Sequence, residues 1–282
     1  MAEALRVDLP GRAVASTSLK LAYGEVRDAL GVLKGFATSL GSAKVGPRDL
    51  EAALEDVDAG CSRLTESAAQ CVTLLQTLLG AGCAGDLLLT VEEHTTALRN
   101  KVRASRPMNA TRRIDLEHTM HSILAELESC LSLIDLLKES AVSDPISVDL
   151  TSLLSAGRGS EPDLHATKRT VLAQAVVQLS QHEFLVKPRV ATLILAQSVA
   201  FVTGEKSNRC TIRISDTPGG GFSITIDRNA QATGVSYREI EIAVPRTLPA
   251  SEICCQTAAR TCIAQVHWEQ APRRAVLTWA AH

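Results

Sequence analysis

The sequence predicts an α+β protein in two parts, a helical bundle over residues 15–140 and an α/β sandwich over residues 145–282, after a flexible N-terminus of residues 1–14. In the first part, apolar residues recur at steps of three and four, which is the spacing of amphipathic helices. In the second part, apolar and polar residues alternate with a period of two between helical segments, as in strands. A chain of 282 residues is long enough to bury a substantial core.

Short turns divide the first part into four predicted helices. The segments GSAKVGPRD (41–49) and GAGCAG (80–85) contain the glycines and the proline that interrupt helical periodicity. Helices joined by such short turns pack as antiparallel neighbours in an up-and-down bundle. The predicted helices cover residues 16–40, about 50–79, about 87–104 and 112–138.

The helix over 112–138 has the most regular pattern of the chain. Its apolar residues follow steps of 4, 3, 4, 3, 4 and 3, the spacing of a bundle seam. His118 and His121 fall outside this seam, so we expect both imidazoles to face solvent. The seam consists of Leu116, Met120, Ile123, Leu127, Cys130, Ile134 and Leu137.

The second part predicts one mixed sheet covered on one face by helices. Two clean alternations, 210–214 and 222–226, flank the turn sequence DTPGGG and predict a hairpin. A linker with a short helix is expected near its start, over residues 144–163. The other predicted elements are helices over 167–181, 188–203 and 251–265 and strands over 239–244, 266–268 and 275–279.

The composition excludes several function classes. The net charge of −2 gives no global attraction to nucleic acid, so no nucleic-acid partner is expected. No apolar run reaches 18 residues and no charged-then-apolar leader is present, which predicts a soluble protein without membrane insertion. The eight cysteines form no CxxC pair and no His–Cys metal spacing, which fits a reducing cytoplasm and no metal site.

The order of elements resembles the core of a two-component histidine kinase, in which a dimerisation and phosphotransfer hairpin precedes an ATP-binding domain. AYGEVRDALGVLKGFATSL (22–40) is similar to the phospho-acceptor helix, with Glu25, Arg27 and Leu30 in register but Gly24 in place of the histidine. Residues 116–154 are similar to the second hairpin helix and its run-in. The end of the chain, 259–280, looks like the closing helix and hairpin of the ATP-binding domain.

The residues that such a domain needs for ATP are missing, so the resemblance implies a degenerate histidine-kinase-type ATPase sandwich without cofactor. Gln197 and Ser198 stand where an asparagine should hold Mg²⁺. Such a domain also binds adenine through an aspartate that glycines follow, whereas Asp227, at the end of the corresponding strand, is followed by Arg-Asn-Ala. The glycines 219–221 lie in a hairpin turn and not before a helix that could present its amides to phosphate. Phosphoryl transfer from ATP would have no electrostatic support, and no kinase activity is expected.

A kinase-like dimer without a nucleotide site resembles the bacterial histidine phosphotransferases. Thr119-Met120-His121-Ser122 and LIDLL (133–137) match the acceptor helix of that family in register, with Ser122 in place of the usual acid. The resemblance implies that His121 is the phospho-acceptor, and an idle surface histidine is the alternative. The same helix serves as second hairpin helix in the kinase alignment, so only one of the two alignments can hold. His94, in EEHTTALRN, is the weaker candidate.

The densest basic run of the chain extends from the helix over 87–104 into the first turn of the helix of His121. It could bind the acidic pocket of a receiver domain, a phosphate backbone, or only water. A metal site at His118 and His121 would lack a third ligand, and none is expected. The run comprises Arg99, Lys101, Arg103, Arg106, Arg112 and Arg113.

These observations predict a non-catalytic signalling protein of the bacterial cytoplasm that forms a homodimer through its N-terminal helices. It would act as a histidine phosphotransferase or as a pseudokinase adaptor, and its partner would be a response-regulator receiver domain or a histidine kinase. A structural helical scaffold without phosphotransfer is the alternative from another class, and a weak true ATPase is a second one.

Overall fold

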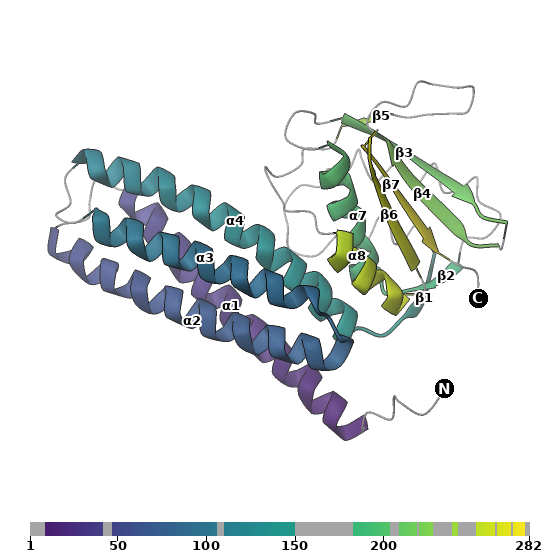
Figure 1. The fold of residues 1–282 in the computed structure, drawn as a ribbon, viewed down its shortest axis with the longest axis horizontal. Coiled ribbons are helices and arrows are strands. Elements are labelled where there is room, and N and C mark those ends of the chain that lie inside the picture. Colours follow the sequence, from purple (N-terminus) through teal and green to yellow (C-terminus); the bar gives the residue numbers. More distant parts are fainter. Residues whose placement is uncertain are drawn as a thin grey trace. The chain divides into compact units, whose positions relative to one another are not determined.

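A computed structural model describes residues 9–41, 47–105, 110–149, 183–203, 209–218, 220–227, 239–241, 252–262, 264–271 and 273–279. By its internal contacts the chain divides into two units, Met1–Lys138 and Glu139–His282. The first is helical and the second combines helices with a sheet, which confirms the α+β class (Figure 1).

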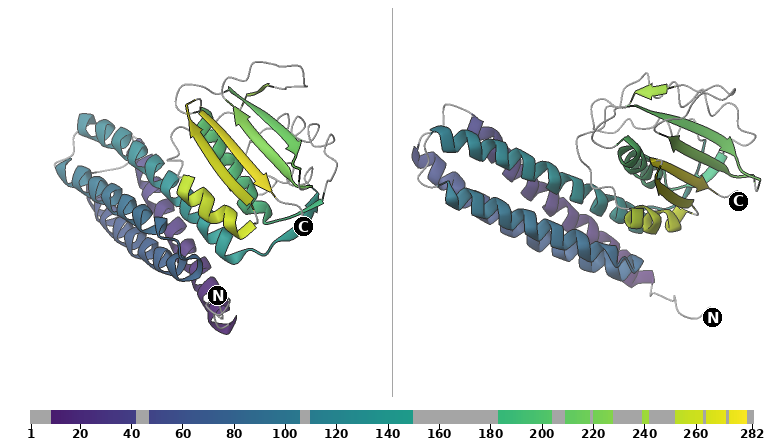
Figure 2. Two further views of the ribbon diagram at one scale, coloured as in Figure 1. Left: turned by 45° about the vertical axis from the view of Figure 1, so that its right-hand side comes forward. Right: turned by 45° about the horizontal axis from the view of Figure 1, so that its top comes forward.

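Unit 1 consists of four helices that run side by side (Figures 1 and 2). They are α1 (Leu9–Gly41), α2 (Pro47–Leu79), α3 (Cys83–Ala104) and the greater part of α4 (Ala110–Val142). All four predicted helices are confirmed. The helix α1 begins at Leu9, inside the N-terminal segment that we expected to be flexible. Gly80 ends α2 in a left-handed conformation (φ 61°) and its N–H bonds the carbonyl of Gln76.

The core of unit 1 is closed within a single chain. Each helix contributes a leucine with no exposed surface, namely Leu33, Leu64, Leu98 and Leu127. Side-chain hydrogen bonds also link neighbouring helices: the Tyr23 hydroxyl of α1 donates to a carbonyl of α4, and two threonine hydroxyls join α2 to α3. We expected a second copy to cover the apolar stripes of the α1–α2 hairpin. In the described structure α3 and α4 of the same chain cover them, so these stripes supply no argument for a dimer.

The described part of unit 2 contains two antiparallel sheets. The small one pairs β1 (Ile146–Asp149) with β2 (Glu183–Val186). The larger has the strand order β5-β3-β4-β7-β6. Every strand pair that the structure describes is antiparallel, so the mixed sheet that we predicted is not found there. The strands of the larger sheet are β3 (Arg209–Asp216), β4 (Phe222–Asp227), β5 (Glu239–Glu241), β6 (Ala264–Gln270) and β7 (Arg273–Trp279).

Two of the other elements predicted for unit 2 are confirmed, and two differ in the structure. The hairpin around DTPGGG is confirmed as β3–β4, and the helix over 188–203 as α7 (Pro188–Thr203). The helix predicted over 251–265 ends early, as α8 (Glu252–Ala259) followed by the 3-10 turn η1 (Arg260–Cys262), because the alternation of buried and exposed residues in β6 begins at Ala264. The described start of the linker expected over 144–163 contains the strand β1, and the helix predicted over 167–181 lies outside the described residues.

One face of the larger sheet packs on α7 and α8 (Figure 2). The residues Phe222, Ile224 and Ile226 of β4 point to this side and are buried. Aromatic rings fill much of the layer: Phe222 stacks on Trp279 with ring centroids 4.7 Å apart, and Phe201 of α7 stacks on Trp268 at 4.6 Å. The few aromatic residues of the chain are thus concentrated in the core of unit 2.

Side chains of α8 cover the outer edge of β6, the last strand of the sheet. The backbone N–H of Trp268 donates to the Glu252 carboxylate at 2.9 Å. The side-chain amide of Gln256 donates to the Val266 carbonyl at 3.3 Å and to the Glu252 carboxylate at 3.1 Å. The backbone N–H of Trp268 and the carbonyl of Val266 are therefore satisfied, so these two groups are not available to pair with a further strand. The same contacts fix the position of Trp268 in the core.

Candidate functional site

The two histidines of α4 lie on its solvent-exposed side. His118 and His121 are both exposed, whereas Met120 between them has no exposed surface. The prediction that the seam would leave both imidazoles outside is confirmed. Neither ring has a hydrogen-bond or ion-pair partner among the residues that the structure describes. A 33-residue helix without Gly or Pro fixes the backbone beneath them.

His94 has a different environment, between two helices. It projects from α3 toward α4, where its Nε2 lies 3.2 Å from a carboxylate oxygen of Glu126. Its side chain is 22% exposed. A carboxylate beside one imidazole nitrogen fixes the orientation of the ring and makes the other nitrogen a better nucleophile. Among the histidines that we selected from the sequence, His94 is the one with this arrangement.

The structure does not bring His94 and His121 into one site. His121 precedes Glu126 by five residues, so the two side chains leave α4 in directions about 140° apart. Since Glu126 is turned toward His94 on α3, His121 faces elsewhere. The two histidines are therefore alternatives and not partners in one reaction.

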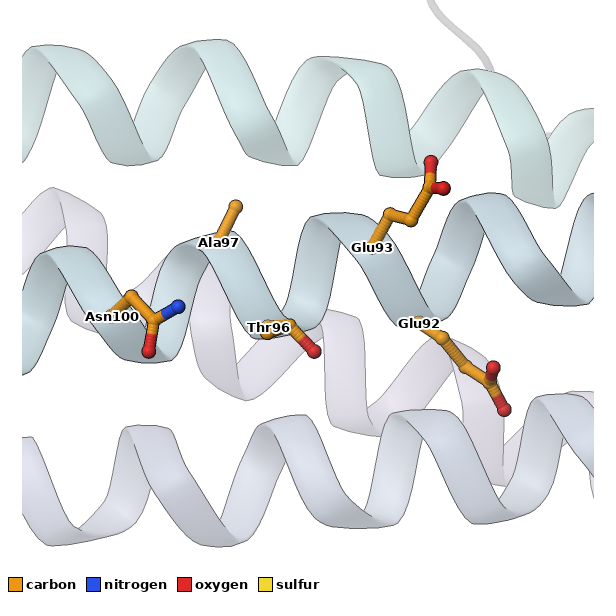
Figure 3. Close-up of a pocket in the computed structure, with 5 residues that line it drawn as sticks. All are labelled: Glu92, Glu93, Thr96, Ala97 and Asn100. Atoms are coloured by element: carbon orange, nitrogen blue, oxygen red, sulfur yellow. The ribbon is translucent and has the colours of Figure 1, made fainter.

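A shallow hollow of about 420 Å³ lies on the part of α3 that also carries His94 in its sequence (Figure 3). It is lined by Glu92, Glu93, Thr96, Ala97 and Asn100. The figure shows the two carboxylates pointing apart, Glu93 toward α4 and Glu92 toward α2. Because its polar groups do not converge, the hollow has the shape of a contact surface and not of a small-molecule site.

The basic run is divided among several contacts within unit 1. Arg99 and Arg103 both pair with Asp58 of α2, at 3.4 and 3.3 Å, and Arg99 also donates to the Ser62 hydroxyl at 2.8 Å. Arg113 donates to the Leu40 carbonyl of α1. These arginines stabilise contacts between helices.

Two of the other members of the run are exposed to solvent. Lys101 and Arg112 are exposed, and Arg106 lies outside the described residues. Lys101 follows His94 by seven residues, about two turns, so both lie on the same side of α3. The structure therefore places one cation of the run on the side of His94.

In unit 2, the positions that the kinase resemblance assigned to Mg²⁺ belong to the core. Gln197 is 2% exposed and Ser198 is 0% exposed. The Ser198 hydroxyl accepts a hydrogen bond from the Trp268 indole N–H at 3.1 Å. This position of α7 thus holds an aromatic ring of the sheet.

Asp227, which the resemblance assigned to adenine, lies on the other side of the sheet from the helices. It follows the buried Ile226 of β4, and successive strand residues point to opposite faces. Its carboxylate pairs with Arg274 of β7 at 3.3 Å, directly across the strand pair. The carboxylate is therefore turned away from the layer between sheet and helices, and it is engaged by an arginine of the neighbouring strand.

Burial decides the chemistry of the thiols. Desolvation raises the pKa of Cys61 and Cys130 to about 11 and that of Cys71 to about 12. Cys254 and Cys255 are buried, as expected for small apolar residues of a helix. In the part of the chain that the structure describes, no group of three or more His, Cys, Asp or Glu side chains is placed to hold a metal ion.

Comparison of the chain with protein-family models, with curated proteins and with solved structures gives no match. Within the described ranges, no helix is both long and apolar enough to cross a membrane.

Sequence reasoning missed Glu126 as a site residue. It selected His94 without a carboxylate partner, because no acid follows that histidine in the chain. The partner comes from another helix, 32 residues away, at 3.2 Å. Only the pairing of α3 with α4 reveals it.

Proposed function

We propose that this chain is a non-catalytic, histidine-kinase-like signalling protein of the bacterial cytoplasm. Its helical bundle docks the receiver domain of a response regulator, and His121 carries a phosphoryl group taken from that receiver without the use of ATP. The observation that carries the proposal is the exposed imidazole of His121 on an uninterrupted bundle helix, with no partner among the described residues.

Phosphoryl transfer from a receiver to His121 needs little beyond an exposed imidazole on a rigid helix. A neutral imidazole nitrogen attacks the phosphorus of the aspartyl phosphate, the N–P bond forms, and the O–P bond to the receiver breaks. The aspartate leaves as a carboxylate, and the other imidazole nitrogen releases its proton to water. A nucleophile held on a rigid helix lowers the entropic cost of such an encounter.

His94 is the second candidate acceptor, favoured by its contact with Glu126. The carboxylate occupies Nε2, so Nδ1 would be the attacking nitrogen. Lys101, on the same side of α3, would offer a charge to the acidic receiver. The limited exposure of the His94 side chain counts against this histidine, because the receiver must reach the imidazole ring.

The independence from ATP is supported by two contacts in unit 2. Ser198 bonds the indole of Trp268, and Asp227 pairs with Arg274. Both positions that a nucleotide would need are engaged within the chain. If no histidine accepts phosphate but a receiver still binds, the chain is a pseudokinase adaptor; if neither occurs, it is a structural scaffold.

The test is phosphoryl uptake from a panel of receivers labelled on their aspartates. His121→Ala should abolish acid-labile label on the chain, and His118→Ala is the matched control, since it removes another exposed imidazole of the same helix. Loss of label in His94→Ala, with slower uptake in Glu126→Gln, would move the acceptor to α3. Full labelling of the His121→Ala and His94→Ala variants would refute both assignments.

A further inference from the structure

The side of α1 that faces away from the bundle core exposes large apolar side chains. Val14, Leu21 and Val32 are 66%, 67% and 46% exposed. They are 7 and 11 residues apart, close to two and three whole turns, so all three share one side of the helix. A repeated apolar side on an outer helix face is typical of a contact with another helix.

Glycines lie beside these side chains. Gly24, Gly31 and Gly35 follow at steps of seven and four and therefore form a line along α1. A Cβ atom at any of the three would meet no heavy atom within 4 Å. Each glycine costs the helix about 1 kcal/mol relative to alanine. Packing among the described residues does not require them, whereas the close approach of a second helix would.

Charged residues border the glycine line in an asymmetric way. Arg27 lies about 60° to one side of Gly24 and Asp28 about 40° to the other. Lys20 and Arg27 lie seven residues apart on the basic side, while Leu21 and Asp28 lie on the opposite side. Lys34, seven residues further along, pairs with Glu128 of α4 in the same chain. Arg27 and Asp28 are both exposed, and neither has an ion-pair partner among the described residues.

The charges beside the glycine line of α1 complement those of a second α1 helix only when the two helices are parallel. Arg27 and Asp28 are neighbours in sequence and therefore lie at nearly the same height on α1. In a parallel pair of α1 helices with a twofold axis between them, Arg27 of each copy faces Asp28 of the other. An antiparallel pair would instead place the basic side against the basic side. The stem of Lys20 would in the same way cover Leu21 of the other copy.

We propose that a second copy of this chain docks on the outer face of α1, parallel and in register, with the glycine line at the closest approach. This contact differs from the dimer core that we expected from the α1–α2 hairpin, and it does not depend on the proposed phosphotransfer. A contact between two helices is smaller than a standard interface of ~1,600 Å², so we expect a reversible dimer whose population depends on protein concentration.

The experiment is sedimentation of the full chain over a wide concentration range. The 30.0 kDa monomer should associate to a species of twice that mass as concentration rises. Gly31→Arg should abolish association while helix content and melting temperature are kept, because that position faces open space. Ala125→Arg, at an exposed position of α4, is the matched control and should leave association unchanged.

Charge reversal then identifies the occupant and its orientation. Arg27→Asp and Asp28→Arg should each weaken association at least tenfold, because each sets like charges against each other, and the double reversal should restore it. A monomer at every concentration would overturn the proposal. So would a dimer that Gly31→Arg leaves intact, or a double reversal no better than the single ones.

Discussion

Replacing Leu64 by alanine tests whether the bundle is closed within one chain. Leu64 of α2 has no exposed surface and contacts the core that all four helices of unit 1 share. Removal of three carbon atoms at ~0.8 kcal/mol each costs about 2.4 kcal/mol in transfer free energy. The cavity left behind raises the expected loss of unfolding free energy to about 3–4 kcal/mol.

The assay is urea unfolding followed by far-ultraviolet circular dichroism. Leu89→Ala is the matched control, since Leu89 of α3 is 56% exposed and the same substitution should there change stability by no more than about 0.5 kcal/mol. Because the chain has two units, the Leu64→Ala shift should appear in the transition of the helical unit alone.

Protein concentration separates this explanation from the alternative. A core closed within one chain predicts a loss that is the same at low and high concentration, since no partner contributes to it. A loss that disappears at high concentration would show that Leu64 lies in a subunit interface. A loss no larger than that of Leu89→Ala would refute the described packing of α2.

Three further outcomes follow from unit 2 and from the thiols. Calorimetry with Mg²⁺ and ATP should show no binding, because Ser198 and Asp227 are engaged within the chain; micromolar affinity would contradict this. Trp268→Phe should lower the stability of unit 2 by about 1–2 kcal/mol, because the buried Ser198 hydroxyl loses its donor; an unchanged urea midpoint would contradict it. Burial raises the pKa of Cys71 from 9.0 to about 12, so its contribution to stability is full below pH 9 and lost as pH rises toward 12. Urea midpoints of Cys71→Ala and of the parent chain should therefore converge above pH 9.

The sequence predicted those elements whose signal is local. Apolar steps of three and four indicated all four helices of unit 1, and the alternation around DTPGGG indicated the hairpin β3–β4. The pair β1–β2 was not predicted, because each strand has only four residues and its partner lies more than 30 residues away. Nothing within Ile146–Asp149 distinguishes such a strand from a linker.

Periodicity also indicates that a stripe is buried without saying what covers it. The stripe of α1 and α2 was assigned to a second copy, whereas helices of the same chain cover it. The site shows the same limit: the exposure of His121 follows from its place outside the seam, but the contact of His94 with Glu126 depends on how α3 and α4 align. The local sequence pattern thus predicts which side of its helix a residue occupies. Which residue of another helix it contacts depends on how the helices pack.

Gly24 has two possible explanations, one from the kinase resemblance and one from helix packing. The kinase resemblance explains it as the slot of a lost acceptor histidine, which accounts for one glycine. Gly31 and Gly35 then need a separate cause, although both lie on the line through Gly24 and both face open space. Close approach of a second helix accounts for all three positions at once and for the exposed Leu21 beside them. Packing against a second helix therefore explains more features of α1 than the kinase resemblance does.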